Sequence, residues 1–256
     1  PAQVMFQGSG KVAVAMPHPT NPDRIHCESE KDDDHARLGS ASSWPQVLAP
    51  ARHSSASLVD RGKGLNVLYE AIERMHVLGV ECQFVLVKWG DQVDSVRGRF
   101  RHLEEAGRVR WVELMSRPQL ELEMRRSVAV VDQFLIPAYG AIGLDSLRVG
   151  TPLLTRSSQA LDTAFFGCPA PVLATQTCDE LVKNLWQILE GGTRPNSTYD
   201  DAVAWFEAHA SWQQSLQVRV SAYASIISCP VAVAKRSLPL RSATSTLILN
   251  VVVPRE

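Results

Sequence analysis

The chain has 256 residues, of which 45% are hydrophobic, and its 26 basic and 27 acidic side chains leave a formal net charge of -1. This length fits one large domain or two small ones, with enough apolar residues for a core. The balanced charge argues against a protein that binds nucleic acid through a general basic field, and no apolar run approaches the roughly 20 residues of a membrane-spanning helix.

The cysteines indicate the compartment. There are five of them, scattered and without a C-x-x-C pair: Cys27, Cys82, Cys168, Cys178 and Cys229. An odd, unpatterned set is typical of reduced thiols rather than of a disulfide framework. With no secretory leader visible, the sequence predicts a cytoplasmic protein, and a peripheral position on the inner face of the membrane stays open.

The chain divides by composition into three segments. Residues 1–45 are rich in Pro, Ser, Asp and His and are predicted to be a linker. Residues 46–225 alternate short apolar runs with amphipathic stretches, which predicts one α/β domain. Residues 226–256 contain Pro230 and Pro239, a basic patch and the β-branched run 246–253. This last segment is predicted to be a tail, either an added edge strand or an extension.

Predicted strands and helices alternate within residues 46–225. The strands are expected at 46–49, 83–88, 108–112, 128–131, 152–155 and 171–174. The helices are expected at 64–79, 93–106, 118–126, 144–149, 179–190 and 200–223. Such an order predicts a single, Rossmann-like, doubly wound parallel sheet. In sheets of this kind, ligands bind at the carboxyl ends of the strands, near the reversal in strand order.

One stretch combines several signals. Residues 130–154 read V-V-D-Q-F-L-I-P-A-Y-G-A-I-G-L-D-S-L-R-V-G-T-P-L-L. An apolar strand is followed by a glycine-spaced loop, a helix that carries Asp145 and a second apolar strand. The backbone N–H groups near Gly140, Ala141 and Ile142 come at the start of that helix, where a phosphate group would be stabilised.

Two basic residues are expected at the same edge of the sheet. Arg52 follows the first predicted strand and Lys63 precedes the first long helix. A bound diphosphate would need cationic partners there. A solvated arginine and a lysine that merely flanks a helix would give the same pattern, so both readings stay open.

Together these residues resemble the donor-binding signature of retaining glycosyltransferases with the two-domain GT-B fold, the family 4 (group 1) type. The resemblance spans about residues 12–224 and implies the C-terminal, donor-binding half of that fold. It implies that a nucleoside diphosphate sugar is bound as a substrate and that its glycosyl group is transferred with retention, without a metal or another cofactor. Arg52 and Lys63 would be the catalytic cations on the diphosphate, and Asp145 would bind the ribose.

Two positions depart from the family pattern. Asp145 stands where the family has a glutamate, and Pro137 stands where a first glutamate would contact the donor sugar. A subgroup of the family carries an Asp-Gln-Phe segment and a Pro-Ala-aromatic-Gly turn, as residues 132–134 and 137–140 do here. By the same resemblance, Trp111 and Arg117 belong to the strand and loop that read the nucleotide base, although Trp111 would also fit a core aromatic.

The resemblance also bears on partners. Residues 16–24 resemble the hinge that precedes the donor domain, so the acceptor domain is expected to be missing and to be supplied by a separate domain or chain. The alternative is a non-catalytic nucleotide-binding or partner-docking domain derived from a glycosyltransferase. A dehydrogenase or a sugar epimerase is disfavoured because no G-x-G-x-x-G follows a strand, and a hydrolase because no G-x-S-x-G is present.

Overall fold

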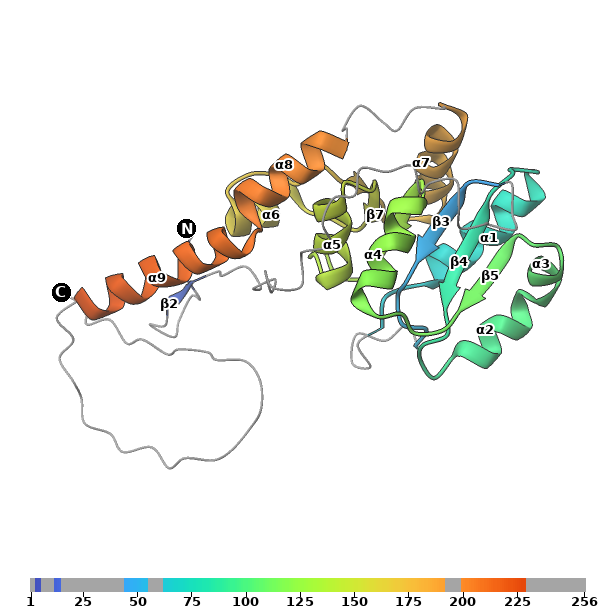
Figure 1. Ribbon diagram of the computed structural model, residues 1–256, viewed down its shortest axis with the longest axis horizontal. Coiled ribbons are helices and arrows are strands. Elements are labelled where there is room, and N and C mark those ends of the chain that lie inside the picture. Colours follow the sequence, from blue (N-terminus) through green and yellow to red (C-terminus); the bar gives the residue numbers. More distant parts are fainter. Residues whose placement is uncertain (1–2, 6–11, 15–43, 55–61, 192–198, 229–256) are drawn as a thin grey trace.

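The computed structural model describes residues 3–5, 12–14, 44–54, 62–191 and 199–228 (Figure 1). Its main sheet has six parallel strands in the order β5-β4-β3-β6-β7-β8. The strands are β3 (Gln46–Ala49), β4 (Gln83–Val87), β5 (Val109–Val112), β6 (Ala129–Val131), β7 (Leu153–Thr155) and β8 (Leu173–Ala174). The predicted doubly wound parallel sheet is therefore confirmed.

The strand order reverses between β3 and β6. The chain builds outward from β3 to β4 and β5, then returns and builds outward in the opposite direction through β6, β7 and β8. Val47 of β3 pairs with Phe84 on one side and with Ala129 on the other. Ligands of open α/β sheets bind at such a reversal, outside the carboxyl ends of the two strands.

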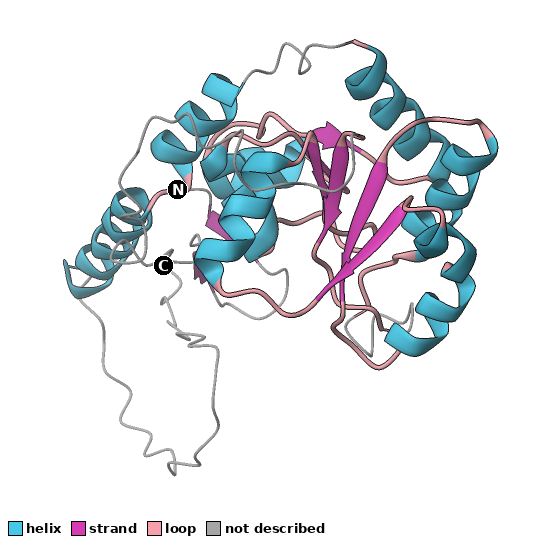
Figure 2. Cartoon of the chain, turned by 45° about the vertical axis from the view of Figure 1, so that its right-hand side comes forward, coloured by secondary structure: helices cyan, strands magenta, loops and turns pink. Residues whose placement is uncertain are grey.

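Helices cover both faces of the sheet, which explains why its strands are continuous apolar runs. Figure 2 shows the strands between two groups of helices. Alternate strand residues enter two different clusters, because successive side chains point to opposite faces. Val47 and Ala49 belong to the cluster formed with α1 (Asn66–Val77) and α7 (Cys178–Glu190). Leu48 belongs to the cluster formed with α4 (Arg117–Arg126), α5 (Ala141–Val149) and α8 (Tyr199–His209).

The observed helices agree only in part with the predicted ones. They are α1 (Asn66–Val77), α2 (Val93–Arg99), α3 (Arg101–Glu105), α4 (Arg117–Arg126), α5 (Ala141–Val149), α6 (Gln159–Phe166), α7 (Cys178–Glu190), α8 (Tyr199–His209) and α9 (Trp212–Ser228). The single helix predicted at 93–106 is wrong, since the chain leaves the helical region at Phe100 (φ -100°, ψ 12°). The single helix predicted at 200–223 is also wrong, because α8 ends at His209 and α9 begins at Trp212.

Two further helices differ from the sequence-based expectation. Helix α5 begins at Ala141 rather than at residue 144, immediately after the N-cap Gly140. Helix α6 was not predicted, although both of its ends carry ordinary signals. Ser158 accepts a hydrogen bond from the Leu161 amide at its start, and Gly167 adopts a left-handed conformation (φ +88°) at its end.

The segments that flank the sheet are described only in part. Within the predicted linker, β1 (Gln3–Met5) and β2 (Val12–Val14) pair as antiparallel strands. The hinge-like residues 16–24 and the tail run 246–253 lie outside the described residues. No helix in the described part of the chain has the length and apolarity needed to cross a membrane.

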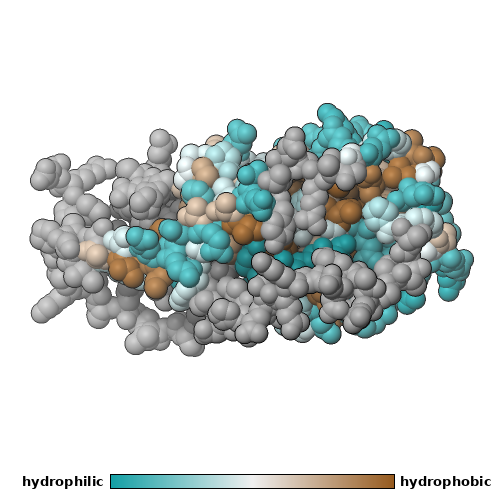
Figure 3. Space-filling model, turned by 45° about the horizontal axis from the view of Figure 1, so that its top comes forward, coloured by the Kyte–Doolittle hydropathy of each residue, from teal (hydrophilic) through white to brown (hydrophobic). Residues whose placement is uncertain are grey.

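Helix α9 runs out from the rest of the fold (Figure 1). Leu216, Val220 and Tyr223 are exposed on it, and their spacing places them on one face of a helix. Figure 3 shows apolar groups among polar ones on this part of the surface. The face therefore presents an apolar stripe to solvent.

Candidate functional site

The reversal in strand order brings together two segments that are distant in sequence. Arg52 and His53 follow β3, and Asp132 comes directly after β6. Because β3 and β6 are parallel neighbours, both segments lie at the same carboxyl edge. The Asp132 side chain is 1% exposed there, and its amide donates to the carbonyl of Leu154 at 3.2 Å.

Lys63 connects this edge to the segment before α1. Its ammonium Nζ lies 3.3 Å from Asp132 Oδ1 and 3.3 Å from Gln133 Oε1. Its backbone carbonyl accepts a hydrogen bond of 2.8 Å from the Phe134 amide. Both the side chain and the main chain of Lys63 are thus held against the residues that follow β6.

The turn at residues 137–140, which ends in Gly140 and is called the glycine turn below, lies against the same lysine. A Cβ atom at Gly140 would stand 3.6 Å from Lys63 Nζ and 3.8 Å from Asp132 Oδ2. Gly140 is the N-cap of α5, and the next residue, Ala141, is exposed. The ammonium and the first amides of α5 therefore concentrate positive charge at one spot, which is an arrangement that binds phosphate.

Asp132 is the buried partner in this arrangement. Its Oδ2 atom has no hydrogen-bond partner among the described residues and lies 3.7 Å from where a Cβ at Gly143 would be. Burial raises the pKa of this carboxyl, and the Lys63 ammonium opposes that rise. Asp132 thus orients the Lys63 ammonium. Gly140 and Gly143, which have no side chains, leave the space that Asp132 Oδ2 occupies.

Asp145 and Arg117 form a second group on α4 and α5. Arg117 Nη2 lies 2.5 Å from Asp145 Oδ1, and Arg148 Nε lies 3.6 Å from the same oxygen. Arg148 also donates to Glu121 on α4 at 2.8 Å. The two predicted residues are therefore in contact, and a ribose at Asp145 would share the carboxylate with Arg117.

The remaining predicted residues lie in the segment after β3, on α5 and on β5. Arg52 is half-buried in the segment after β3, and Ile142 is partly buried against the cluster of α4, α5 and α8. Trp111 packs against the other core cluster, with its ring centroid 5.1 Å from that of His53. Its indole nitrogen has no partner among the described residues. The predicted contact of Trp111 with the nucleotide base stays a prediction.

Sequence reasoning gave no role to Asp132, Gln133 or His53. A polar pair directly after a buried strand was a usable signal for the first two, since that position lies at the ligand-binding edge. His53 was visible only as the neighbour of Arg52. The structure places it fully buried, with Nδ1 2.7 Å from the hydroxyl of Tyr69.

We expect His53 to make the stability of the fold fall in mild acid. Burial lowers the pKa of His53 to about 4 from the ordinary value of 6.5. The unfolded chain therefore takes up a proton first, and the stability that is present above pH 6.5 is lost as the pH falls towards 4. The free energy of unfolding should drop by about 2 kcal/mol between pH 7.5 and pH 5.

Urea unfolding at the two pH values measures this drop. His53→Gln should remove most of it, whereas His102→Gln, at an exposed position on α3, should leave it in place. An equal drop in the wild type and in His53→Gln would contradict the assignment.

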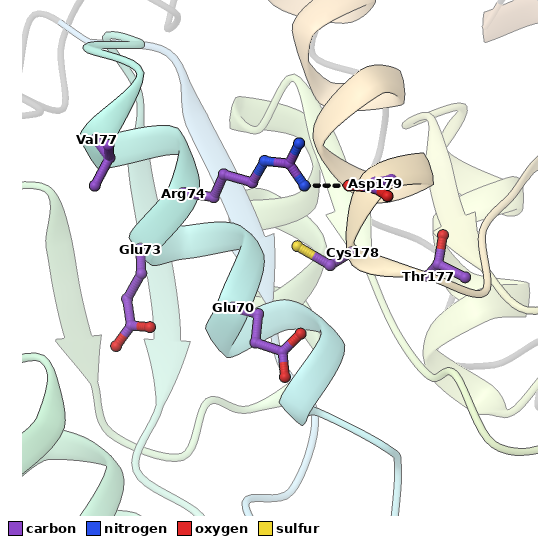
Figure 4. Close-up of a pocket in the computed structure, with 7 residues that line it drawn as sticks. All are labelled: Glu70, Glu73, Arg74, Val77, Thr177, Cys178 and Asp179. Carbon is purple, nitrogen blue, oxygen red and sulfur yellow. Dashed lines mark hydrogen bonds and ion pairs between the residues drawn. The ribbon is translucent and has the colours of Figure 1, made fainter.

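A separate groove lies between α1 and α7 (Figure 4). It has a volume of about 640 Å³ and is lined by Glu70, Glu73, Arg74, Val77, Thr177, Cys178 and Asp179. Arg74 reaches across it to an ion pair with Asp179. None of the predicted site residues is among these lining residues. Within the described ranges, the structure also contains no cluster of three or more His, Cys, Asp or Glu side chains suited to a metal ion.

Comparisons with known proteins bear on the fold. No protein-family model matches the chain, and a search of curated sequences found no match either. Among solved structures, a sucrose-phosphate synthase from Thermosynechococcus elongatus is similar with a TM-score of 0.55 and 17% identity, over 72% of this chain and 46% of that one. A glycosyltransferase from Rickettsia africae gives a TM-score of 0.57 and 15% identity, over 76% and 54%.

A third similar structure is WaaG, a glycosyltransferase involved in lipopolysaccharide biosynthesis, with a TM-score of 0.54 and 16% identity over 83% of this chain and 55% of that one. At these identities the likeness establishes the fold alone. The chain spans about half the length of these structures. The fold resemblance seen in the sequence is therefore confirmed.

Proposed function

We propose that the chain is the donor-binding domain of a retaining glycosyltransferase and that it binds a nucleoside diphosphate sugar as its substrate. One observation carries the proposal. The Lys63 ammonium lies beside the glycine turn that opens α5, at the reversal in strand order. The family resemblance of residues 130–154 and the fold shared with known glycosyltransferases support it.

Each residue has a defined task in this proposal. When the glycosyl bond breaks, negative charge grows on the departing diphosphate, and preorganised positive groups lower the barrier most at that moment. Lys63, the first amides of α5 and Arg52 would offset this charge. Asp145 would accept hydrogen bonds from the ribose hydroxyls, and Arg117 would hold its carboxylate in place.

The proposed reaction also needs a site for the acceptor. The similar structures are about twice as long as the part that the chain matches, so we propose that a second domain or a separate chain supplies the acceptor site. Transfer would then require both parts, whereas nucleotide binding would require this domain alone.

Calorimetric titration of the chain with UDP, GDP and ADP tests the proposal. We expect saturable binding of one nucleotide, weakened at least about tenfold by Arg52→Ala and by Asp145→Asn. The asparagine keeps the size of Asp145 and its contact with Arg117, so the variant is expected to fold, and circular dichroism checks this. A folded wild-type chain that binds none of the three nucleotides would overturn the proposal.

A further inference from the structure

Cys168 lies in a constellation that the donor site does not use. It follows Gly167, the C-cap of α6, and faces α8. Its Sγ atom is 3.2 Å from His209 Nε2 and 3.1 Å from Trp205 Nε1. His209 in turn has its Nδ1 atom 2.8 Å from the carbonyl oxygen of Phe166. The Cys168 thiol contacts His209, and the Phe166 carbonyl orients the ring of His209. A nucleophile, a base and a group that orients the base are arranged in this way in sites with an activated thiol.

The hydrogen bonds determine where the protons are. A carbonyl oxygen only accepts, so His209 Nδ1 must carry a hydrogen and donate it to Phe166. In the neutral ring, Nε2 therefore presents its lone pair to the thiol of Cys168 and can take its proton. The indole of Trp205 only donates, so its N–H is directed at the sulfur. Both contacts are made to the same sulfur atom.

Cys168 lies in a segment that is partly exposed. Cys168 is half-buried, and its neighbours Gly167 and Pro169 are exposed. Of the other two cysteines in the described part of the chain, Cys82 is buried, which raises its pKa to about 11. Cys178 is half-buried like Cys168 and lines the groove between α1 and α7, and burial raises its pKa. These two thiols therefore serve as internal references.

We propose that Cys168 is a thiol-modification site, with His209 as its base, and that it exchanges with small disulfides. His209 Nε2 takes the thiol proton, and the Cys168 thiolate attacks one sulfur of the disulfide R–S–S–R. A Cys168–S–S–R bond forms, the original S–S bond breaks, and RS⁻ leaves and is protonated as RSH. The oxidising partner is the disulfide itself, so no further oxidant is needed.

Modification of Cys168 is expected to disturb the glycine turn through the aromatic side chains that lie between them. The ring of Trp205 packs 5.1 Å from that of Phe166 and 6.4 Å from that of Tyr139. Tyr139 directly precedes Gly140, and its hydroxyl donates to Asp162 at 2.6 Å. A group attached to the Cys168 sulfur would replace the hydrogen bonds that this sulfur makes with Trp205 and His209, so we expect it to disturb the aromatic rings against which the turn is packed. The expected loss of nucleotide affinity rests on the proposed function.

Kinetic mapping with glutathione disulfide tests the site. The native chain is incubated with the disulfide, quenched with acid, and each cysteine-containing peptide is quantified by mass spectrometry. We expect Cys168 to form the mixed disulfide at least about tenfold faster than Cys178 and Cys82. His209→Gln should lower the Cys168 rate at least about tenfold and leave the Cys178 rate unchanged.

The wild-type chain supplies a second measurement that needs no variant. In concentrated urea, the excess rate of Cys168 over Cys178 should disappear, because it depends on contacts that only the fold makes. A Cys168 rate no higher than that of Cys178 in the native chain, or an excess that persists in urea, would overturn the proposal. So would an unchanged Cys168 rate in folded His209→Gln.

The same samples separate this proposal from the proposed function. The rates of modification are read without any nucleotide. Nucleotide affinity is then compared before and after modification, with Cys168→Ser as the control that cannot be modified. If the untreated chain binds no nucleotide, the proposed function fails while the exchange rates still decide the role of Cys168.

Discussion

Replacing Gly90 by alanine is expected to destabilise the fold by about 3–5 kcal/mol, at the upper end of what single substitutions do. Gly90 has a φ of +120°, and a Cβ atom there would stand 2.0 Å from the carbonyl oxygen of His53. That oxygen accepts from the Gln92 amide at 3.1 Å, and the His53 amide donates to Trp89 at 2.7 Å. The methyl group would thus force apart the two segments that follow β3 and β4.

Two other glycines separate the causes of this loss. Gly79 also has a positive φ, of +72°, but a Cβ there would meet nothing within 4 Å. Gly79→Ala should therefore cost only the backbone strain, about 1–2 kcal/mol. Gly98 lies inside α2 with open space around it, and Gly98→Ala should stabilise the chain by about 0.5–1 kcal/mol. Urea unfolding of the three variants gives the order.

The contact between Gly90 and His53 is what this series measures. If Gly90→Ala costs no more than Gly79→Ala, the close approach of the two segments is not present in solution. The segment after β3 also carries Arg52, so a loss larger than that of Gly79→Ala would show that the Arg52 segment is fixed by direct backbone packing.

The sheet could be predicted from the sequence because its strands are buried on both faces. Such strands appear as short, largely apolar runs, as residues 46–49 and 83–87 do. The strand order could not be predicted, since it depends on which face each crossover helix covers. The reversal between β3 and β6 therefore became visible only in the structure.

The helix boundaries failed where periodicity continues through a break. Phe100 is fully buried, and its ring lies edge-on to that of Tyr69 at 5.8 Å. It satisfies the apolar pattern of a longer helix while its backbone leaves the helical region. Ala210 is likewise fully buried between α8 and α9. Periodicity reports which side chains face the core, not whether the backbone between them stays helical.

The candidate site residues are predicted by their positions and by the family resemblance. Arg52 and Lys63 are candidates because they flank elements whose ends meet at one edge of the sheet. Their partners were not found, because the contact between Lys63 and Asp132 joins residues 69 positions apart. The contact between Arg117 and Asp145 depends in the same way on how α4 and α5 pack against each other. Long-range pairing of this kind has no local signature in a single sequence.

Replacing Lys63 by methionine is expected to weaken binding of the preferred nucleoside diphosphate about 30- to 100-fold, or about 2–3 kcal/mol. Methionine keeps the apolar stem of the lysine and removes the charge that stands beside Gly140. The fold should tolerate the change, because burial already raises the pKa of Asp132 and the carboxyl can take up a proton when its cation is gone. Calorimetry measures the affinity, and urea unfolding measures the stability.

Two matched variants decide whether the loss belongs to this one charge. Lys183→Met removes an exposed lysine on α7 and changes the net charge equally, so it should leave the affinity within about twofold. Asp132→Asn keeps the ammonium but removes the charge of the carboxylate that orients it, so its loss should lie between those of the two lysine variants. Equal affinities of Lys63→Met and Lys183→Met would mean that the diphosphate does not bind at the start of α5. An Asp132→Asn variant weaker than Lys63→Met would instead mean that Asp132 contacts the ligand itself, since a residue that acts only through Lys63 cannot matter more than Lys63 does.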